Sequence, residues 1–224
     1  MISRRLEQLL LWPARARGRR RLRRIVLENI QNRSFVVMPE VFNPATFRSG
    51  RVLAEYIANS PGLNAKHQNS TALDLGTGCG VQAIMAAARG FSVTAIDINP
   101  HAVRCARLNV LLNHAEESVT VLEGDLFSPI EHQTFDLVVF NPPFFDGNPT
   151  STFELAWRST DGIERFAASL PAALNADATA LIIWSSHADE TRLLNALSRS
   201  GLKVSKAHTC RVVGEKMTIF QAQR

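Results

Sequence analysis

Residues 74–80 read Asp-Leu-Gly-Thr-Gly-Cys-Gly, at the end of a short apolar run that begins at Thr71 and just before a helical segment that begins at Val81. Three glycines in five residues allow a tight turn, and they let a ligand approach the backbone without meeting a Cβ atom. A glycine-rich turn between a strand and a helix is typical of nucleotide-binding βα units. We therefore expect this turn to be the first ligand-binding loop of an α/β domain.

Strand-length apolar runs and helical segments alternate after this loop, which predicts right-handed βαβ units. The last two strands have no helix between them and should form an antiparallel hairpin. The predicted fold is α/β, a doubly wound, mostly parallel seven-stranded Rossmann-like sheet that ends in this hairpin. The expected strands are residues 71–75, 91–97, 119–123, 135–140, 179–184, 203–208 and 217–221, and the expected helices are residues 81–89, 99–113, 163–174 and 188–200.

The segment before this region is basic and helical in its pattern. Leu22, Ile25, Val26 and Ile30 fall on one helical face, which predicts an amphipathic helix over residues 19–31. We expect a basic helical N-terminal extension, residues 1–33, followed by the catalytic domain, residues 34–224.

Positive charge is concentrated in this extension. Nine of the 25 basic residues, all arginines, and one of the 20 acidic residues fall within the first 24 positions, a local balance of +8 against a total of +5. Such a block is typical of a solvated tail or of an arm that contacts RNA, the ribosome or another acidic partner. Both interpretations stay open at this point.

The three cysteines, Cys79, Cys105 and Cys210, are widely spaced and suggest neither a zinc site nor a disulfide framework. No apolar run reaches membrane-spanning length, and no secretory signal follows the basic start. We therefore expect a cytoplasmic protein without a metal site or membrane partner.

Three acids follow the ends of the expected strands. Asp97 lies 21 residues after Gly76, where a carboxylate can accept both ribose hydroxyls of an adenosine. Asp74 begins the loop, and a carboxylate at this position suits the cationic methionine part of S-adenosylmethionine (SAM). Val81 stands where the fingerprint of a dinucleotide-binding dehydrogenase would carry another glycine, so the loop favours SAM over a dinucleotide. Asp125 could accept from the adenine amine while Leu126 packs on the ring, or it could be an ordinary turn aspartate.

A second motif, Asn141-Pro142-Pro143-Phe144, follows the strand that ends at residue 140. The two prolines remove two amide donors and fix two φ angles, which leaves a stiff ledge of acceptors. The Asn141 side-chain oxygen and the Pro142 carbonyl can both accept from an –NH2 group, and Phe144 offers a face for a planar substrate. This chemistry favours methyl transfer to an amide or amine nitrogen, in which positioning and nearby acceptors supply the catalysis.

With these two motifs the chain resembles the class I SAM-dependent methyltransferases over residues 36–222. More narrowly, it is similar to the small methyltransferase group, with HemK/PrmC-type glutamine methyltransferases and rRNA guanine-N2 methyltransferases. Residues 41–50 resemble the segment that helps to cover the cofactor, with Ser49 a weaker candidate. The resemblance implies a catalytic set of Asn141, Pro142, Pro143 and Phe144, and a SAM-binding set of Phe42, Thr46, Asp74, Gly76, Thr77, Gly78, Gly80, Asp97, Ile98, Asp125, Leu126 and Asn141.

The acceptor is left open by the sequence. We expect a protein glutamine or a nucleobase amine; the alternatives are a small nitrogen-containing metabolite or a non-catalytic RNA-binding module that uses the arginine arm. Trp157 and Arg158 are candidates for the acceptor pocket, and His187 is a weaker one.

Overall fold

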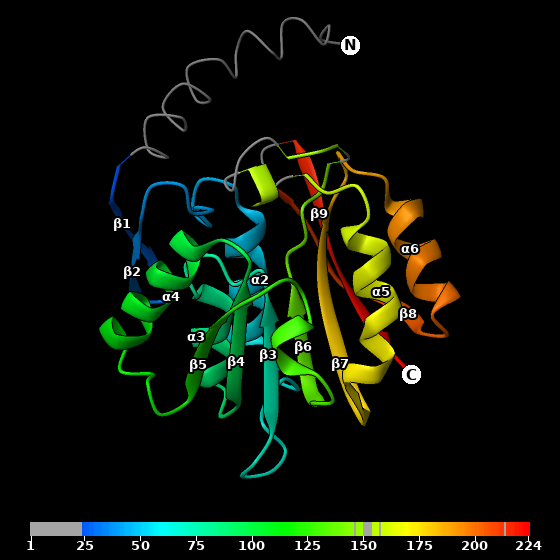
Figure 1. Ribbon diagram of the computed structural model, residues 1–224, viewed down its shortest axis with the longest axis horizontal. Helices are drawn as coiled ribbons and strands as arrows, with labels where there is room; N and C mark the ends of the chain where they lie inside the picture. The colour runs from blue at the N-terminus through cyan, green and yellow to red at the C-terminus, as the bar shows by residue number, and fades with distance from the viewer. Residues whose placement is uncertain (1–23, 146, 150–153, 157, 213) are drawn as a thin grey trace, which may run out of the picture.

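A computed structural model describes residues 24–145, 147–149, 154–156, 158–212 and 214–224 of the chain. Its centre is a seven-stranded sheet in the order β5-β4-β3-β6-β7-β9-β8 (Figure 1), in which β3 to β7 are parallel and β9 is antiparallel to both neighbours. The predicted fold class is confirmed. The strands are β3 (Thr71–Leu75), β4 (Ser92–Asp97), β5 (Val119–Glu123), β6 (Phe135–Phe140), β7 (Leu174–Ser185), β8 (Lys203–Val212) and β9 (Glu215–Gln223).

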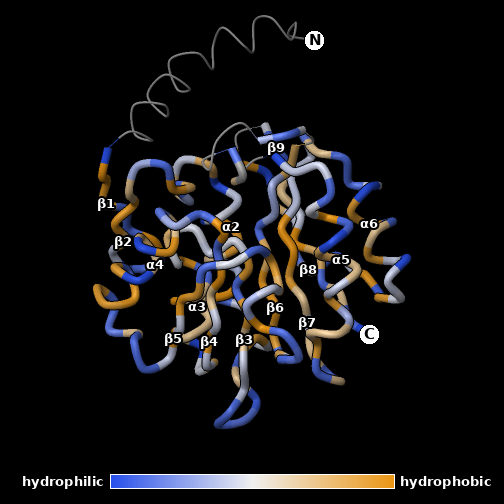
Figure 2. The backbone as a smooth tube through the Cα atoms, in the orientation of Figure 1, coloured by the Kyte–Doolittle hydropathy of each residue, from blue (hydrophilic) through white to orange (hydrophobic). Residues whose placement is uncertain are grey.

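Helices cover both faces of the sheet, because successive strand residues point to opposite sides. Ala72 belongs to one buried cluster and Leu73 to the other, and Figure 2 shows apolar residues along the central strands. One face packs against α2 (Ser49–Asn59), α3 (Val81–Ala87) and α4 (Pro100–Leu112); the other packs against α5 (Gly162–Ala173) and α6 (Glu190–Arg199). Two short 3-10 helices, η1 (Ser128–Ile130) and η2 (Glu154–Ala156), lie in the connections.

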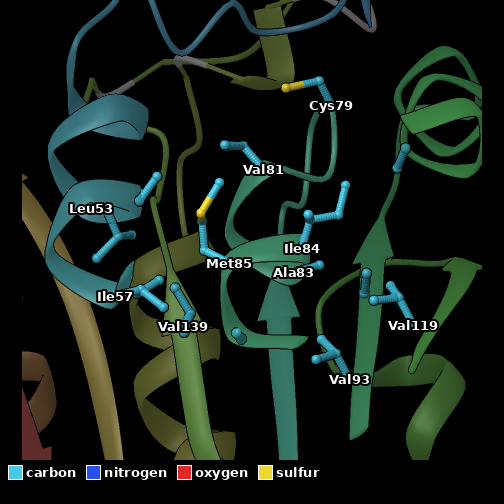
Figure 3. Packing of buried hydrophobic residues seen from close by; sticks show 14 of the residues in the cluster. Leu53, Ile57, Cys79, Val81, Ala83, Ile84, Met85, Val93, Val119 and Val139 are labelled. Carbon is cyan, nitrogen blue, oxygen red and sulfur yellow. The ribbon is translucent and has the colours of Figure 1, made fainter. Parts of the chain in front are cut away.

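The first cluster fixes the helix that follows the glycine loop. Met85 of α3 points toward α2, which contributes Leu53 and Ile57, and Ile84 lies on the other side of α3 in the same cluster (Figure 3). All four side chains are buried, and each contributes about 1.5–3 kcal/mol of transfer free energy relative to exposure. The helix start, and with it the loop, is thereby held against the sheet.

The predicted amphipathic helix over residues 19–31 is wrong in its described part. Val26–Ile30 form strand β1, which pairs with β2 (Arg33–Val37) in a two-stranded sheet. Gln31 and Asn32 have φ angles of 51° and 59°, the left-handed geometry that two-residue hairpin turns require. This hairpin crosses the expected boundary at residue 33, and the division into 1–33 and 34–224 stays a prediction; residues 1–23 of the arm lie outside the described part.

Asn109 of α4 ties this hairpin to the glycine loop. Its Oδ1 accepts from the Val36 N–H at 2.8 Å, and its Nδ2 donates to the Val36 carbonyl at 2.7 Å and to the Cys79 carbonyl at 2.8 Å. The side chain is fully buried, so these bonds satisfy groups that water cannot reach. The small sheet therefore packs as part of the α/β domain.

The closing hairpin is longer than predicted. β8 extends to Val212 and β9 begins at Glu215. The turn between them therefore lies at the edge of the sheet where the parallel strands end (Figure 1), hereafter the carboxyl edge. No helix within the described ranges is long and apolar enough to span a bilayer.

Candidate active site

A cavity of about 300 Å³ lies at the carboxyl edge of the sheet. Its walls come from the turns after four parallel strands, from Phe42 in the segment before α2, and from residues that lead into and begin α5. The lining includes Phe42, Gly76, Gly78, Asp97, Ile98, Gly124, Asp125, Leu126, Phe140, Asn141, Pro143, Arg158 and Arg165. The topology thus brings residues more than 100 positions apart in the sequence to one site.

The glycine loop is held by Asp97. Gly76 and Gly78 have φ angles of 61° and 59°, which an L side chain rarely adopts. Asp97 accepts from the Gly78 N–H at 2.8 Å and from the Asn99 N–H at 2.9 Å. Burial raises the pKa of Asp97 above its usual value, while these N–H groups oppose the rise. One carboxylate therefore fixes the turns after β3 and β4.

Asp74 lies beneath the loop and does not line the cavity. It accepts from the Thr77 hydroxyl at 2.6 Å and from the Ala83 N–H at 3.0 Å, so it joins the loop to the first turn of α3. Burial raises its pKa to about 7. Thr77 is likewise absent from the cavity wall, and the structure gives both residues a role in shaping the loop.

Gly80, another expected cofactor contact, also lies away from the cavity wall. It precedes α3 with a φ angle of 84°, and an added Cβ would lie 3.3 Å from the Cα of Ala106 in α4. The absence of a side chain at 80 therefore allows α3 and α4 to pack closely.

Phe42 reaches the cavity because Asn43 anchors its segment. Asn43 Nδ2 donates to Glu28 Oε1 at 2.9 Å, and its Oδ1 accepts from the Ala45 and Thr46 N–H groups at 2.9 and 2.8 Å. Thr46 and Ser49 do not line the cavity; their hydroxyl oxygens are buried without a hydrogen-bond partner among the described atoms. Of the expected cover residues, only Phe42 is at the site.

Asn141 follows β6 and lines the cavity. Its Oδ1 atom is buried and has no hydrogen-bond partner in the described part of the protein. Pro143 also lines the cavity, whereas Pro142 is buried and is not among the lining residues. Phe144 is not on the cavity wall; its ring meets Trp184 edge to face, with centroids 5.6 Å apart. Two of the four motif residues thus line the cavity, and the other two lie next to them in the chain.

The cavity wall also contains residues that the motifs do not predict. Among them are Phe140, at the end of an expected strand, and Arg165, within an expected helix; Arg158 is a predicted candidate for the acceptor pocket and lines the cavity. Arg165 donates to Asp125 at 2.6 Å across the cavity rim, and this bond raises the pKa of the guanidinium. In the sequence, the only indication that Arg165 belongs to the site is its place as a cation in the first turn of the helix that follows the Asn-Pro-Pro-Phe motif.

The other candidates lie elsewhere. Trp157 falls outside the described residues. His187 is not on the cavity wall; its Nδ1 lies 3.5 Å from Glu215 Oε1.

Comparisons with known proteins show the family to which this chain belongs. Residues 32–212 match the methyltransferase small domain family. A putative protein N5-glutamine methyltransferase from Methanocaldococcus jannaschii is 30% identical over 169 residues, which are 70% of this chain and 83% of that protein. A tRNA1(Val) (adenine(37)-N6)-methyltransferase from a Flavobacteriaceae bacterium is 38% identical over 80 residues, 35% of each chain.

Solved structures show the same fold. The T. thermophilus 16S rRNA methyltransferase RsmC, in complex with AdoMet and guanosine, has a TM-score of 0.63 at 20% identity, and the match covers 90% of this chain and 50% of that one. With the family match and the relatives, this fold identifies the chain as a class I SAM-dependent methyltransferase. The chain belongs to the methyltransferase small domain family.

The residues at the cavity fit SAM. The left-handed glycines present backbone without Cβ atoms, and the half-buried Asp97 carboxylate stands beside them. Ile98 lines the cavity although 43% of its surface is exposed, and Leu126 lies with it; apolar side chains in this position suit the faces of an adenine ring. The buried Asn141 acceptor completes the wall.

Asp74→Asn is predicted to change how stability depends on pH. Between pH 3.8 and about 7 the unfolded chain ionises Asp74 while the folded protein keeps it protonated, so unfolding releases a proton and stability falls as pH rises. An asparagine oxygen can accept from the same two donors without titrating. Urea unfolding at several pH values should show the variant gaining stability relative to the wild type across this window; a constant difference would refute the raised pKa.

Gly50→Ala is predicted to weaken SAM binding although Gly50 does not line the cavity, because its added Cβ would lie 3.3 Å from Cε1 of Phe42, which does. An added Cβ would lie 2.7 Å from Pro44 Cβ and 3.1 Å from Pro44 Cα, so the segment that carries Phe42 must shift. Overpacking of this kind costs about 1–3 kcal/mol, and we expect a loss of affinity on the order of tenfold by calorimetry. The matched control is Gly62→Ala, where an added Cβ meets no described atom within 4 Å. Equal affinities in the two variants would contradict the role of this segment.

Proposed function

We propose that the protein transfers the methyl group of SAM to a planar nitrogen, the side-chain amide of a protein glutamine or the exocyclic amine of a nucleobase. The observation that carries the proposal is the buried Asn141 Oδ1, an acceptor without a partner among the described residues, at the wall of the cavity that the glycine loop also lines. A buried acceptor without a donor is costly, and such groups call for an explanation in the function of the site.

In this proposal Gly76, Gly78 and Asp97 hold the nucleoside and methionine parts of the cofactor, and Ile98 and Leu126 flank its adenine. Asp125 would accept from the adenine amine and is kept in place by Arg165. Phe42 covers the site from the segment before α2. Bound SAM supplies a methyl group on a positively charged sulfur, which makes that carbon electrophilic.

The residues of the chain then orient the acceptor nitrogen. Asn141 Oδ1 and the Pro142 carbonyl accept from the two N–H bonds of the target, which places its lone pair toward the methyl group. These oxygens also stabilise the positive charge that develops on nitrogen as the new bond forms. Neither Pro142 nor Pro143 has an N–H, so the ledge offers no backbone donor that would compete for the target nitrogen. Phe144 acts through Trp184 to stiffen the ledge.

The activities of the relatives support this choice of acceptor. One is described as a glutamine N5-methyltransferase and another as an adenine N6-methyltransferase. In both, the accepting nitrogen is attached to an sp² carbon and carries two hydrogens, the geometry that two adjacent acceptors recognise. Contact of the arginine arm with RNA or the ribosome, and a cytoplasmic location, are parts of the same proposal.

The test is transfer of labelled methyl from SAM into a cell extract, with protein, RNA and small molecules separated afterwards. The labelled fraction is hydrolysed and its products are identified by mass spectrometry. We expect N5-methylglutamine or an N-methylated nucleoside. Label found on oxygen, carbon or sulfur, or only in small metabolites, would contradict the proposal.

A further inference from the structure

Two cations face each other at the tip of the β8–β9 hairpin. Arg211 of β8 and Lys216 of β9 are directly opposed in the strand register, so their side chains leave the same face about 5 Å apart at Cβ. Like charges in this arrangement repel one another and destabilise a sheet. Neither side chain forms an ion pair within the described ranges.

The acids nearby already have partners. Glu215 accepts from the Ser185 hydroxyl and lies beside His187, and it is one strand position from Lys216, on the opposite face. Glu190 pairs with Lys206 at 3.0 Å, and Asp189 caps α6 by accepting from the Thr191 N–H at 2.9 Å. The hairpin tip therefore keeps an uncompensated positive charge.

This cationic pair lies at the same edge of the sheet as the active site, although neither residue lines the cavity. On the face that carries α6, Phe144 meets Trp184, and Trp184 is opposed by Thr218. The next residue of β9 on that face toward the carboxyl edge is Lys216. Its carbonyl accepts from the N–H of Ser186, the residue after β7, at 2.8 Å, and its N–H donates to the Ser186 hydroxyl at 3.1 Å. Asn141 follows β6, and β9 lies two strand spacings from β6, a distance of about 10 Å.

We propose that Arg211 and Lys216 bind the phosphate backbone of a single-stranded RNA segment whose target base enters the cavity. The inference rests on the proposed function and selects the nucleobase as the acceptor. Phosphates supply one negative charge per nucleotide, and Arg211 can hold two oxygens of one group while Lys216 neutralises a neighbour. Bases in single-stranded RNA are free to leave the stack and present their amine edge. A glutamine side chain carries no charge, so a glutamine acceptor does not by itself require an anion-binding site at the hairpin tip.

The test measures binding of a fluorescein-labelled single-stranded RNA by anisotropy, over a range of salt concentrations and without a methyl donor. Arg211→Gln/Lys216→Gln should lose affinity on the order of tenfold, and its slope of log K against log salt should be shallower by about 1.4, at about 0.7 per phosphate contact. The matched control is Arg199→Gln/Lys203→Gln. It removes the same charge from exposed positions at the opposite end of α6 and β8, and it should keep the wild-type slope.

Two results would overturn the inference. One is equal loss of affinity in the double variant and the control, which would mean that only net charge matters. The other is a glutamate-rich peptide that displaces the RNA at equal charge concentration, which would identify an acidic protein as the partner. Because no methyl donor is present, failure of the proposed methyl transfer leaves this readout unchanged, and the two hypotheses are tested separately.

Discussion

The parallel pairing of β3 with β4 and β6 is the constraint on which the site depends. Leu75 is paired with Ile96 on one side and with Phe140 on the other. The residues that follow these three, Gly76, Asp97 and Asn141, are therefore side by side at the carboxyl edge of the sheet. A register shift of one residue in either pairing would separate these three residues and turn every side chain of the shifted strand to the other face of the sheet.

The site is built from groups that weaken the folded state. Asp74 is buried with a pKa of about 7, and Asn141 Oδ1 is buried without a described partner. A buried polar group without a hydrogen bond costs about 1–3 kcal/mol. Such local costs persist at functional sites when the surrounding packing fixes the geometry, as the α2–α3 cluster and Asn109 do here. The hairpin tip likewise includes a destabilising arrangement, because the cations Arg211 and Lys216 are held side by side.

Much of this arrangement could be predicted from local sequence. The glycine loop, Asp97 and the Asn-Pro motif each follow a strand, and the rule that parallel strands end at one edge brings them together. The hairpin β1–β2 could not be recognised, because Leu22, Ile25, Val26 and Ile30 satisfy a helical period and Gln31-Asn32 lacks the glycine that usually marks such a turn. Asn109 and Arg165 were missed because their partners lie 73 and 40 positions away. Thr46, Asp74, Thr77 and Gly80 were expected at the cofactor but lie off the cavity wall, since a motif identifies a loop and not which of its side chains face inward.

The most direct measurement compares Asn141→Ala with the wild type in two assays: SAM affinity by calorimetry, and the single-turnover rate of labelled methyl transfer into the acceptor fraction. Removing one acceptor that acts in the transition state should leave the affinity nearly unchanged and lower the rate by about 10²–10³-fold. A variant that retains the wild-type rate would contradict the account, as would one that loses SAM binding in proportion to its rate.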